Sequence, residues 1–158
     1  MLLAEDDGAT AEMYRIGLEA AGFRVRVAAD VTAVFAAMET EIPDVAVLDY
    51  HLSGIITGLD ILDNIRLDVR AESLPVLILT NDSGRNGERD RARRAGALGW
   101  LSKHETDPVR LAAGVSEVLD SGRGRSSSRP TAQLEARRIV GLQKGDGVKH
   151  GRPEASAS

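Results

Sequence analysis

The chain has 158 residues, of which 42% are hydrophobic and only 3% aromatic, which is enough for one domain with a mainly aliphatic core. It contains no cysteine, which excludes disulfides, thiolate metal sites and a cysteine nucleophile, and no run of 18 apolar residues, so we expect a soluble, cytoplasmic protein. Residues 1–120 hold 12 Lys and Arg against 21 Asp and Glu, so this acidic part is a poor surface for nucleic acid, whereas 121–158 hold 8 against 3.

The first half of the chain alternates between strand and helix patterns. In order, we expect a strand at Met1–Ala4, a helix at Ala9–Gly22, a strand at Phe23–Val27, a helix at Val31–Thr40 and a strand at Asp44–Asp49. Asp7 and Asp30 are suited to cap the two helices, and Gly22 is suited to end the first one. The Asp44–Asp49 strand is an uninterrupted apolar run between two aspartates, which is typical of a central parallel strand covered on both faces.

The same alternation continues to about residue 122. In order, we expect a helix that starts at Thr57 or Gly58, a strand at Pro75–Leu79, a very polar helix at 85–95, a strand at Ala97–Ser102, and a helix that is capped by Asp107, starts at Pro108 and ends near Gly122. The helix after Thr57 places Leu59, Leu62, Ile65 and Val69 on one face. Five strand–helix units in succession imply a parallel sheet with right-handed crossovers, that is, a three-layer α/β/α sandwich.

The composition changes at residue 121. Residues 121–158 are basic, rich in Gly, Ser and Arg, and poor in apolar side chains, which is typical of a linker or a disordered segment. The predicted organisation is therefore a folded domain at 1–120 followed by a disordered basic tail at 121–158. This tail is too short and too polar to form an output domain of its own.

Polar side chains follow the ends of four predicted strands. Glu5 and Asp6 follow the first strand, Asp49 ends the third, Thr80 follows the fourth and Lys103 follows the fifth. Because ligands bind at the carboxyl ends of parallel strands, these groups predict one site. Three carboxylates repel one another unless a cation intervenes, and Mg²⁺ commonly joins carboxylates to a phosphate. With a hydroxyl and an ammonium group beside them, the arrangement suits phosphoryl transfer onto Asp49.

These residues also lie in motifs that resemble a known family. Residues 1–120 resemble the receiver domain of bacterial two-component response regulators, the CheY-like domains. Four motifs carry the resemblance in the expected order, at Leu2–Asp7, Val47–Leu52, Leu77–Asn81 and Gly99–Lys103. The resemblance implies a flavodoxin-like fold whose five parallel strands have the order 2-1-3-4-5.

The resemblance also implies a role for each site residue. Asp49 would accept phosphate from a sensor histidine kinase or a histidine phosphotransfer protein, with Mg²⁺ as the cofactor. The implied metal ligands are Glu5 through water, Asp6, Asp49 and the main-chain carbonyl of His51. The implied phosphate-binding and switch residues are Thr80, Asn81, Trp100 and Lys103. By strand alternation, Trp100 should point away from Lys103, toward the surface between the fourth and fifth helices.

Several alternatives remain open. The leading interpretation is a stand-alone receiver that switches partner binding or relays phosphate. The chain could instead be an interaction module that works without phosphorylation, or a remnant of a regulator that has lost a DNA-binding output domain. An aspartate-nucleophile phosphatase needs a second acid two residues after the nucleophile, and His51 at that position argues against an enzyme. His104 follows Lys103 where the family often has a cis-proline, so we expect a trans peptide bond there.

Overall fold

The computed structural model describes residues 1–52, 54–82 and 86–126. The strands are β1 (Leu2–Ala4), β2 (Arg26–Ala28), β3 (Ala46–Asp49), β4 (Val76–Thr80) and β5 (Gly99–Ser102). The helices are α1 (Gly8–Ala20), α2 (Val31–Thr40), α3 (Gly58–Leu67), α4 (Asn86–Arg94) and α5 (Pro108–Ser126). The predicted disordered tail lies outside the described residues from 127 onward.

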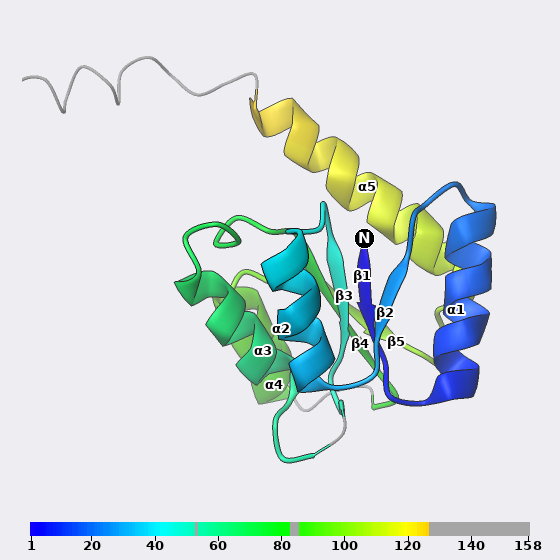
Figure 1. The fold of residues 1–158 in the computed structure, drawn as a ribbon, viewed down its shortest axis with the longest axis horizontal. Helices are drawn as coiled ribbons and strands as arrows, with labels where there is room; N and C mark the ends of the chain where they lie inside the picture. Colours follow the sequence, from blue (N-terminus) through cyan, green and yellow to red (C-terminus); the bar gives the residue numbers. More distant parts are fainter. Residues whose placement is uncertain (53, 83–85, 127–158) are drawn as a thin grey trace, which may run out of the picture. The chain divides into compact units, whose positions relative to one another are not determined.

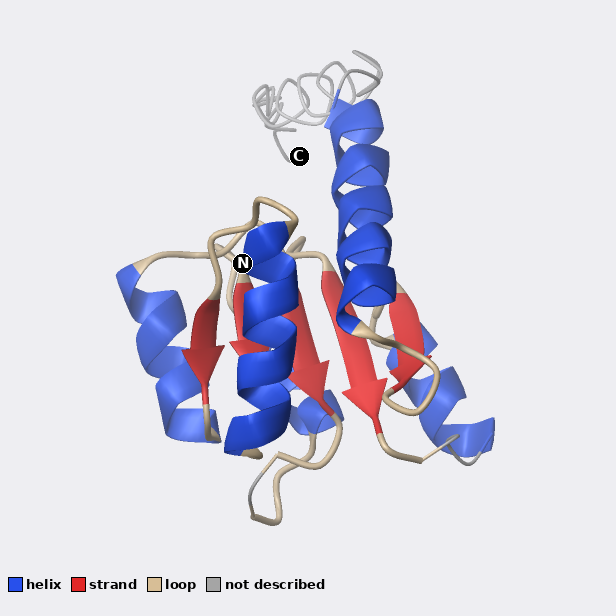
Figure 2. Ribbon diagram, turned by 90° about the vertical axis from the view of Figure 1, so that its right-hand side faces the viewer, coloured by secondary structure: helices blue, strands red, loops and turns tan. Residues whose placement is uncertain are grey.

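The five strands form one parallel sheet in the order β2-β1-β3-β4-β5. This order confirms the predicted flavodoxin-like fold. The strands run in the same direction, so their carboxyl ends meet at one edge of the sheet, where the arrowheads lie side by side in Figure 2. The sheet thus delivers the residues that follow β1, β3, β4 and β5 to a common place.

Helices cover both faces of the sheet. In Figure 1, α1 and α5 lie on one side of the strands, and α2, α3 and α4 lie on the other. Side chains alternate between the two faces along each strand, so Leu2, Ala46 and Ile78 join the core under α2 and α3, while Leu3 and Val47 join the core under α1 and α5. These residues are at most 1% exposed. The uninterrupted apolar pattern of the central strands follows from this double burial.

Helix caps form where the sequence predicts them. Asp7 and Asp30 accept hydrogen bonds from backbone N–H groups three residues later, at the starts of α1 and α2. Thr57 and Asp60 form a capping box at the start of α3, and Asp107 Oδ1 accepts a hydrogen bond from the N–H of Arg110 in α5. Each cap satisfies a backbone donor that a helix start leaves without an intrahelical acceptor.

Three local expectations were wrong. The second strand begins at Arg26 rather than Phe23, because it pairs residue by residue with the short β1, in which Leu2 lies opposite Arg26. Val69 lies beyond the end of α3 and is 82% exposed, so it does not join the helix face. The last helix continues to Ser126 instead of ending near Gly122. Once a helix is nucleated, adding a residue gains a hydrogen bond at little cost, so a single glycine need not end it.

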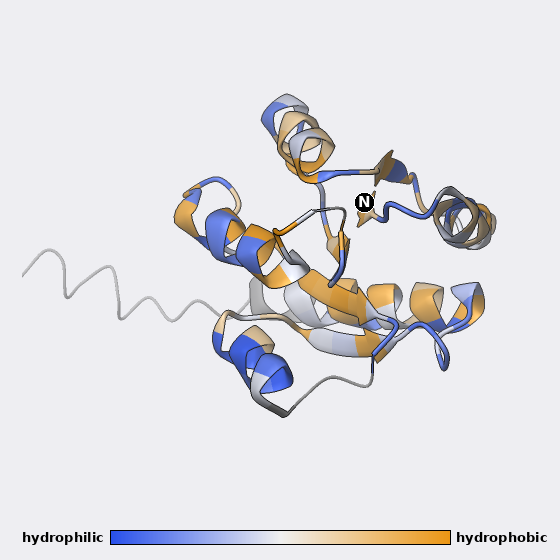
Figure 3. Ribbon diagram, turned by 90° about the horizontal axis from the view of Figure 1, so that it is seen from below, coloured by the Kyte–Doolittle hydropathy of each residue, from blue (hydrophilic) through white to orange (hydrophobic). Residues whose placement is uncertain are grey.

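The helix α4 is held mainly by polar contacts. Figure 3 shows it almost entirely in the hydrophilic colour, and Ala92 is its one buried apolar side chain among those described. Arg91 of α4 forms ion pairs with Asp60 and Asp63 of α3. Arg66 of α3 donates hydrogen bonds to the carbonyls of Ala95 and Gly96, which follow α4. The docking of α4 therefore depends on charge and hydrogen bonding more than on apolar burial.

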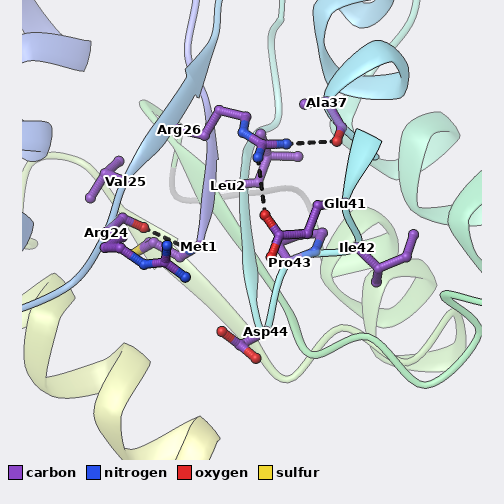
Figure 4. Close-up of a pocket in the computed structure, with 10 residues that line it drawn as sticks. All are labelled: Met1, Leu2, Arg24, Val25, Arg26, Ala37, Glu41, Ile42, Pro43 and Asp44. Atoms are coloured by element: carbon purple, nitrogen blue, oxygen red, sulfur yellow. Dashed lines mark hydrogen bonds and ion pairs between the residues drawn. The ribbon is translucent and has the colours of Figure 1, made fainter. Parts of the chain in front are cut away.

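The opposite end of the sheet contains a small pocket of about 180 Å³ (Figure 4). It lies at the amino ends of β1, β2 and β3, where Arg26 donates hydrogen bonds to the carbonyl of Ala37 and to Glu41. The acidic residues that follow β1 and β3 lie at the other edge of the sheet.

None of the helices within the described ranges is long and apolar enough to cross a bilayer.

Candidate functional site

The carboxyl edge of the sheet brings together the residues that the sequence predicts. Glu5 and Asp6 follow β1, Asp49 ends β3, Thr80 ends β4 and Lys103 follows β5. Glu5, Asp49 and Thr80 are 1%, 3% and 0% exposed. Burial of two carboxylates and a hydroxyl costs free energy unless they are paired or serve a function. This edge is therefore the candidate site.

The three acids form a compact group. Carboxylate oxygens of Glu5, Asp6 and Asp49 all lie within 4.8 Å of one another. Burial raises the pKa of Glu5, and the negative charge of Asp49 adds to this effect against the opposing pull of Lys103. Glu5 Oε2 is fully buried, and the Lys103 ammonium is its partner. Negative charge is thus concentrated here in the arrangement that a hard divalent cation relieves.

Lys103 is the positive charge of the site. Its Nζ donates a hydrogen bond to Asp49 Oδ2 at 2.8 Å and forms an ion pair with Glu5 Oε2 at 2.6 Å. The side chain is 9% exposed, so burial opposes its charge. The hydrogen bonds to Asp49 and Glu5 outweigh burial and raise the pKa of Lys103. Lys103 is therefore held in its protonated form between the two buried carboxylates.

The backbone around Asp49 is closely packed. Asp49 Oδ1 accepts a hydrogen bond from the His51 N–H at 3.1 Å, which fixes the carboxylate from its own loop. Gly58 begins α3 directly against this segment, and its N–H donates to the carbonyl of Tyr50. A Cβ at Gly58 would lie 2.4 Å from the Asp49 carbonyl oxygen. Only glycine permits this approach of the helix start to Asp49.

Thr80 connects β4 to the lysine loop. Its carbonyl accepts a hydrogen bond from the Lys103 N–H at 2.7 Å, and its Oγ1 accepts one from the Asp82 N–H at 3.1 Å. The hydroxyl hydrogen can therefore still be donated to an incoming acceptor. Asn81, the next residue, is exposed at the same edge.

Trp100 lies where strand alternation predicts, and it also contacts Tyr50. It lines a hollow with Arg89 of α4 and Arg110 of α5, which places it between these two helices. Its ring centroid lies 5.4 Å from that of Tyr50, with the planes at 55°. Trp100 Nε1 is buried without a hydrogen-bond acceptor among residues 1–52, 54–82 and 86–126. An unsatisfied buried donor of this kind is costly in free energy.

Sequence reasoning overlooked Tyr50. Its hydroxyl donates a 2.7 Å hydrogen bond to Glu88 of α4, and burial together with this bond raises the pKa of Tyr50 to about 12. Tyr50 directly follows Asp49, and its side chain contacts both α4 and Trp100. Its position directly after Asp49 was the one available signal, but no local pattern names a partner 38 residues away.

The loop after Lys103 has the geometry that the sequence predicts. No cis peptide bond occurs among the described residues, so the bond between Lys103 and His104 is trans. His51 and His104 are both exposed, and neither belongs to a cluster of metal-ligating side chains in the described part of the chain.

The chemistry of the site follows from the position of Asp49. A carboxylate held between a cation and two further acids can accept an electrophilic group such as a phosphoryl.

Comparison with known proteins agrees with this geometry. Residues 1–115 match the sequence model of the response regulator receiver domain. The alginate biosynthesis transcriptional regulatory protein AlgB of Pseudomonas aeruginosa is 31% identical over 158 residues, which cover 99% of this chain and 32% of AlgB. Response regulator Rre1 of Synechocystis is 32% identical over 120 residues, which cover 75% of this chain and 51% of Rre1. The chain spans about half or less of the length of these relatives.

Solved structures show the same fold. Chemotaxis protein CheY4 of Vibrio cholerae superimposes with a TM-score of 0.68 at 26% identity, over 74% of this chain and 95% of CheY4. The receiver domain of NtrX from Brucella abortus superimposes with a TM-score of 0.64 at 25% identity, over 75% of this chain and 97% of that domain.

Proposed function

This chain belongs to the response regulator receiver domain family, and from that premise we propose that it is a phosphorylation-dependent signalling switch whose phosphoacceptor is Asp49. The observation that carries the proposal is the position of the Asp49 carboxylate, which is buried at the carboxyl edge of the sheet between Lys103 and two further acids. An Asp49 oxygen attacks the phosphorus of a phosphohistidine, and the bond from phosphorus to the histidine nitrogen breaks. The product is an acyl phosphate, and the histidine leaves unphosphorylated.

The acidic group fits a resident Mg²⁺. Asp6 and Asp49 would bind it directly, Glu5 would bind it through water, and the main-chain carbonyl of His51 would complete the protein ligands. The chemistry of this donor set supports the proposal, because Mg²⁺ prefers oxygen ligands and keeps several waters. The cation supplies neutralisation of the charge on the transferring phosphoryl group. The three carboxylates lie within 4.8 Å of one another, and the Lys103 ammonium pairs with two of them, which supports a site that is completed by a hydrated cation.

Two neighbours of Asp49 would bind the phosphoryl group. The Lys103 ammonium is 2.8 Å from Asp49 Oδ2, so it can follow the negative charge onto a phosphoryl oxygen. The Thr80 hydroxyl still has its hydrogen to donate, and Asn81 lies beside it at the exposed edge. These contacts would favour the charge distribution of in-line transfer.

The same contacts lead to Trp100. If Thr80 turns its hydroxyl toward a phosphoryl group, the packing behind it changes, and the Trp100 indole takes a second position. Its unsatisfied Nε1 and its contact with Tyr50 support an indole that has two packings of similar free energy. The surface between α4 and α5 would then differ between the two states and would be read by a partner protein.

The partners follow from the chemistry of the family. The phosphate donor would be a sensor histidine kinase or a histidine phosphotransfer protein, and a downstream protein would bind one of the two states. Several relatives are named as transcriptional regulatory proteins, but the chain spans only about a third to a half of them. The proposal therefore concerns the receiver activity that this chain shares with them.

Intact mass spectrometry tests the proposal. The full chain is incubated with Mg²⁺ and acetyl phosphate, from which Asp49 takes the phosphoryl group while acetate leaves. We expect the mass of one phosphoryl group to be added, and we expect chelation of Mg²⁺ to prevent it. Asp49→Asn should abolish the addition, whereas Asp44→Asn, an exposed aspartate at the other end of the sheet, should not. Full phosphorylation of Asp49→Asn would assign the acceptor to another residue.

Fluorescence tests the switch separately. Trp100 is the only tryptophan in the chain, so its emission reports this site alone. Adding beryllofluoride with Mg²⁺ as a phosphoryl mimic should change the emission, and Thr80→Ala should reduce the change. Unaltered emission with a mimic that calorimetry shows to be bound would remove Trp100 from the switch.

A further inference from the structure

The loop that carries Lys103 is tied to α1 by a buried tyrosine. The loop covers residues 103–107, between β5 and α5. The Tyr14 hydroxyl donates a 2.7 Å hydrogen bond to the carbonyl of Thr106, 92 residues away in the chain. Tyr14 is 0% exposed and Thr106 is 7% exposed, so water cannot easily replace this bond.

Both ends of the loop have further anchors. At the start, the Lys103 N–H donates to the carbonyl of Thr80, and the Glu105 N–H donates to the carbonyl of Ser102. At the end, Arg110 Nη1 donates to the Glu105 carbonyl at 2.8 Å. The first two bonds connect the loop to β4 and to the end of β5, and the third connects it to α5. The Tyr14 hydroxyl connects the loop to α1.

The helix α1 approaches the same region one turn later. A Cβ at Gly17 would lie 2.2 Å from the Cβ of Pro108, the first residue of α5. Tyr14 and Gly17 are three residues apart, so they lie on one face of α1. This face therefore contacts both the loop that follows Lys103 and the start of the helix after it. The close approach at Gly17 sets the depth at which the Tyr14 hydroxyl reaches the Thr106 carbonyl.

We propose that Tyr14 is a positioning residue for phosphoryl transfer, because its hydroxyl fixes the 103–107 loop and so holds Lys103 Nζ between Glu5 and Asp49. This inference rests on the proposed function of Asp49. The lysine side chain has four flexible methylene groups, so its ammonium stays in place only if its backbone does. The Tyr14 hydroxyl bonds to the Thr106 carbonyl, so Tyr14 acts on the lysine through the loop.

A purely structural role for Tyr14 makes a different prediction. Tyr14 also packs in the apolar core under α1 and α5, with Leu18 and Val115. If the hydroxyl merely satisfies a buried carbonyl, its removal should lower stability and leave the chemistry unchanged. If it positions Lys103, its removal should slow phosphoryl transfer by more than the loss of stability explains, because small misplacements of a catalytic group are costly in rate.

The test compares Tyr14→Phe with Val115→Ala in the full chain. Val115 is 0% exposed in the same core, and its side chain has no group that could form a hydrogen bond to the loop or the site. Its truncation is therefore a control that lowers stability alone. The rate of Mg²⁺-dependent phosphorylation by acetyl phosphate is measured by intact mass, and the Mg²⁺ affinity is measured by calorimetry. We expect Tyr14→Phe to slow phosphorylation by about tenfold or more while its Mg²⁺ affinity stays within about twofold of the wild type. Val115→Ala should keep both.

Amide hydrogen exchange provides the second readout. Tyr14→Phe should speed exchange at the Lys103 and Glu105 amides, and Val115→Ala should not do so selectively. The inference is overturned if Tyr14→Phe is phosphorylated at the wild-type rate, if Val115→Ala is slowed equally, or if the loop amides keep their protection. Absence of phosphorylation in the wild type, or full phosphorylation of Asp49→Asn, would instead overturn the proposed function itself.

Discussion

The contact between Gly58 and Asp49 predicts that a single methyl group at Gly58 is costly. In Gly58→Ala the new Cβ would lie 2.4 Å from the carbonyl oxygen of Asp49 and 3.1 Å from its carbonyl carbon. Both are backbone atoms of the central strand, so they cannot turn aside as a side chain could. Overpacking of this kind costs about 1–3 kcal/mol. Replacing a helical glycine by alanine returns about 0.4–1 kcal/mol by restricting the unfolded chain. The difference is a net loss of up to about 2.6 kcal/mol, and we expect the upper half of this range because the contacts are with backbone atoms.

Gly8 provides a matched control for this measurement. It is the first residue of α1 and follows the Asp7 cap, just as Gly58 is the first residue of α3 and follows the Thr57 cap. A Cβ at Gly8 would meet no atom within 4 Å. Gly8→Ala should therefore be neutral or stabilising by up to about 1 kcal/mol.

Urea unfolding of the two variants separates these effects. We expect the midpoint of Gly58→Ala to fall and that of Gly8→Ala to stay or rise, with similar slopes for both. Because the strain acts on the Asp49 backbone, Gly58→Ala should also be phosphorylated more slowly than Gly8→Ala. A Gly58→Ala protein as stable as the wild type would mean that α3 can move away from Asp49 at no cost, and the close packing of the acceptor would lose its significance.

Two further predictions concern buried charges. The pKa of Glu5 is raised in the folded protein by burial and by Asp49, so its ionisation costs stability as the pH rises through this raised pKa. Without Mg²⁺, Glu5→Gln should therefore have a higher melting temperature than the wild type at pH 7. The difference should vanish below about pH 4, the ordinary range of the glutamate pKa. A lower melting temperature of the variant at pH 7 would show that the ion pair with Lys103 dominates. Arg66 donates hydrogen bonds to the carbonyls of Leu74, Ala95 and Gly96. Because Arg66→Met leaves these acceptors unpaired, it should lower the free energy of unfolding by about 1–3 kcal/mol, as measured by urea unfolding. Arg70 pairs with Asp68 at the surface, where ion pairs contribute little, so Arg70→Met should lower the urea midpoint much less than Arg66→Met. Equal effects of the two substitutions would refute the role of Arg66.

Local patterns in the sequence determined the layers of this protein. An apolar run such as Asp44–Asp49 can be buried on both faces only in a covered parallel sheet, and the five strand–helix units therefore predicted the sandwich correctly. The caps at Asp7, Asp30 and Asp107 were predictable because a cap joins residues three positions apart.

The chemical residues of the site were also visible in the sequence. The parallel direction of the strands brings Glu5, Asp49 and Lys103 to one edge, whatever their separation along the chain. Their roles in phosphoryl transfer stay predictions. Where local patterns failed, at the start of β2 and at Val69, the outcome depended on how far a neighbouring strand or helix extends.

The contacts that hold the site in place were decided only by the tertiary structure. The bonds from Tyr14 to Thr106 and from Tyr50 to Glu88 join residues 92 and 38 positions apart. A buried tyrosine reads in the sequence as one more apolar residue, because nothing in its neighbourhood shows which distant carbonyl or carboxylate its hydroxyl will meet. That partner depends on the depth at which two helices pack, and this depth is set by side-chain volumes across the whole core.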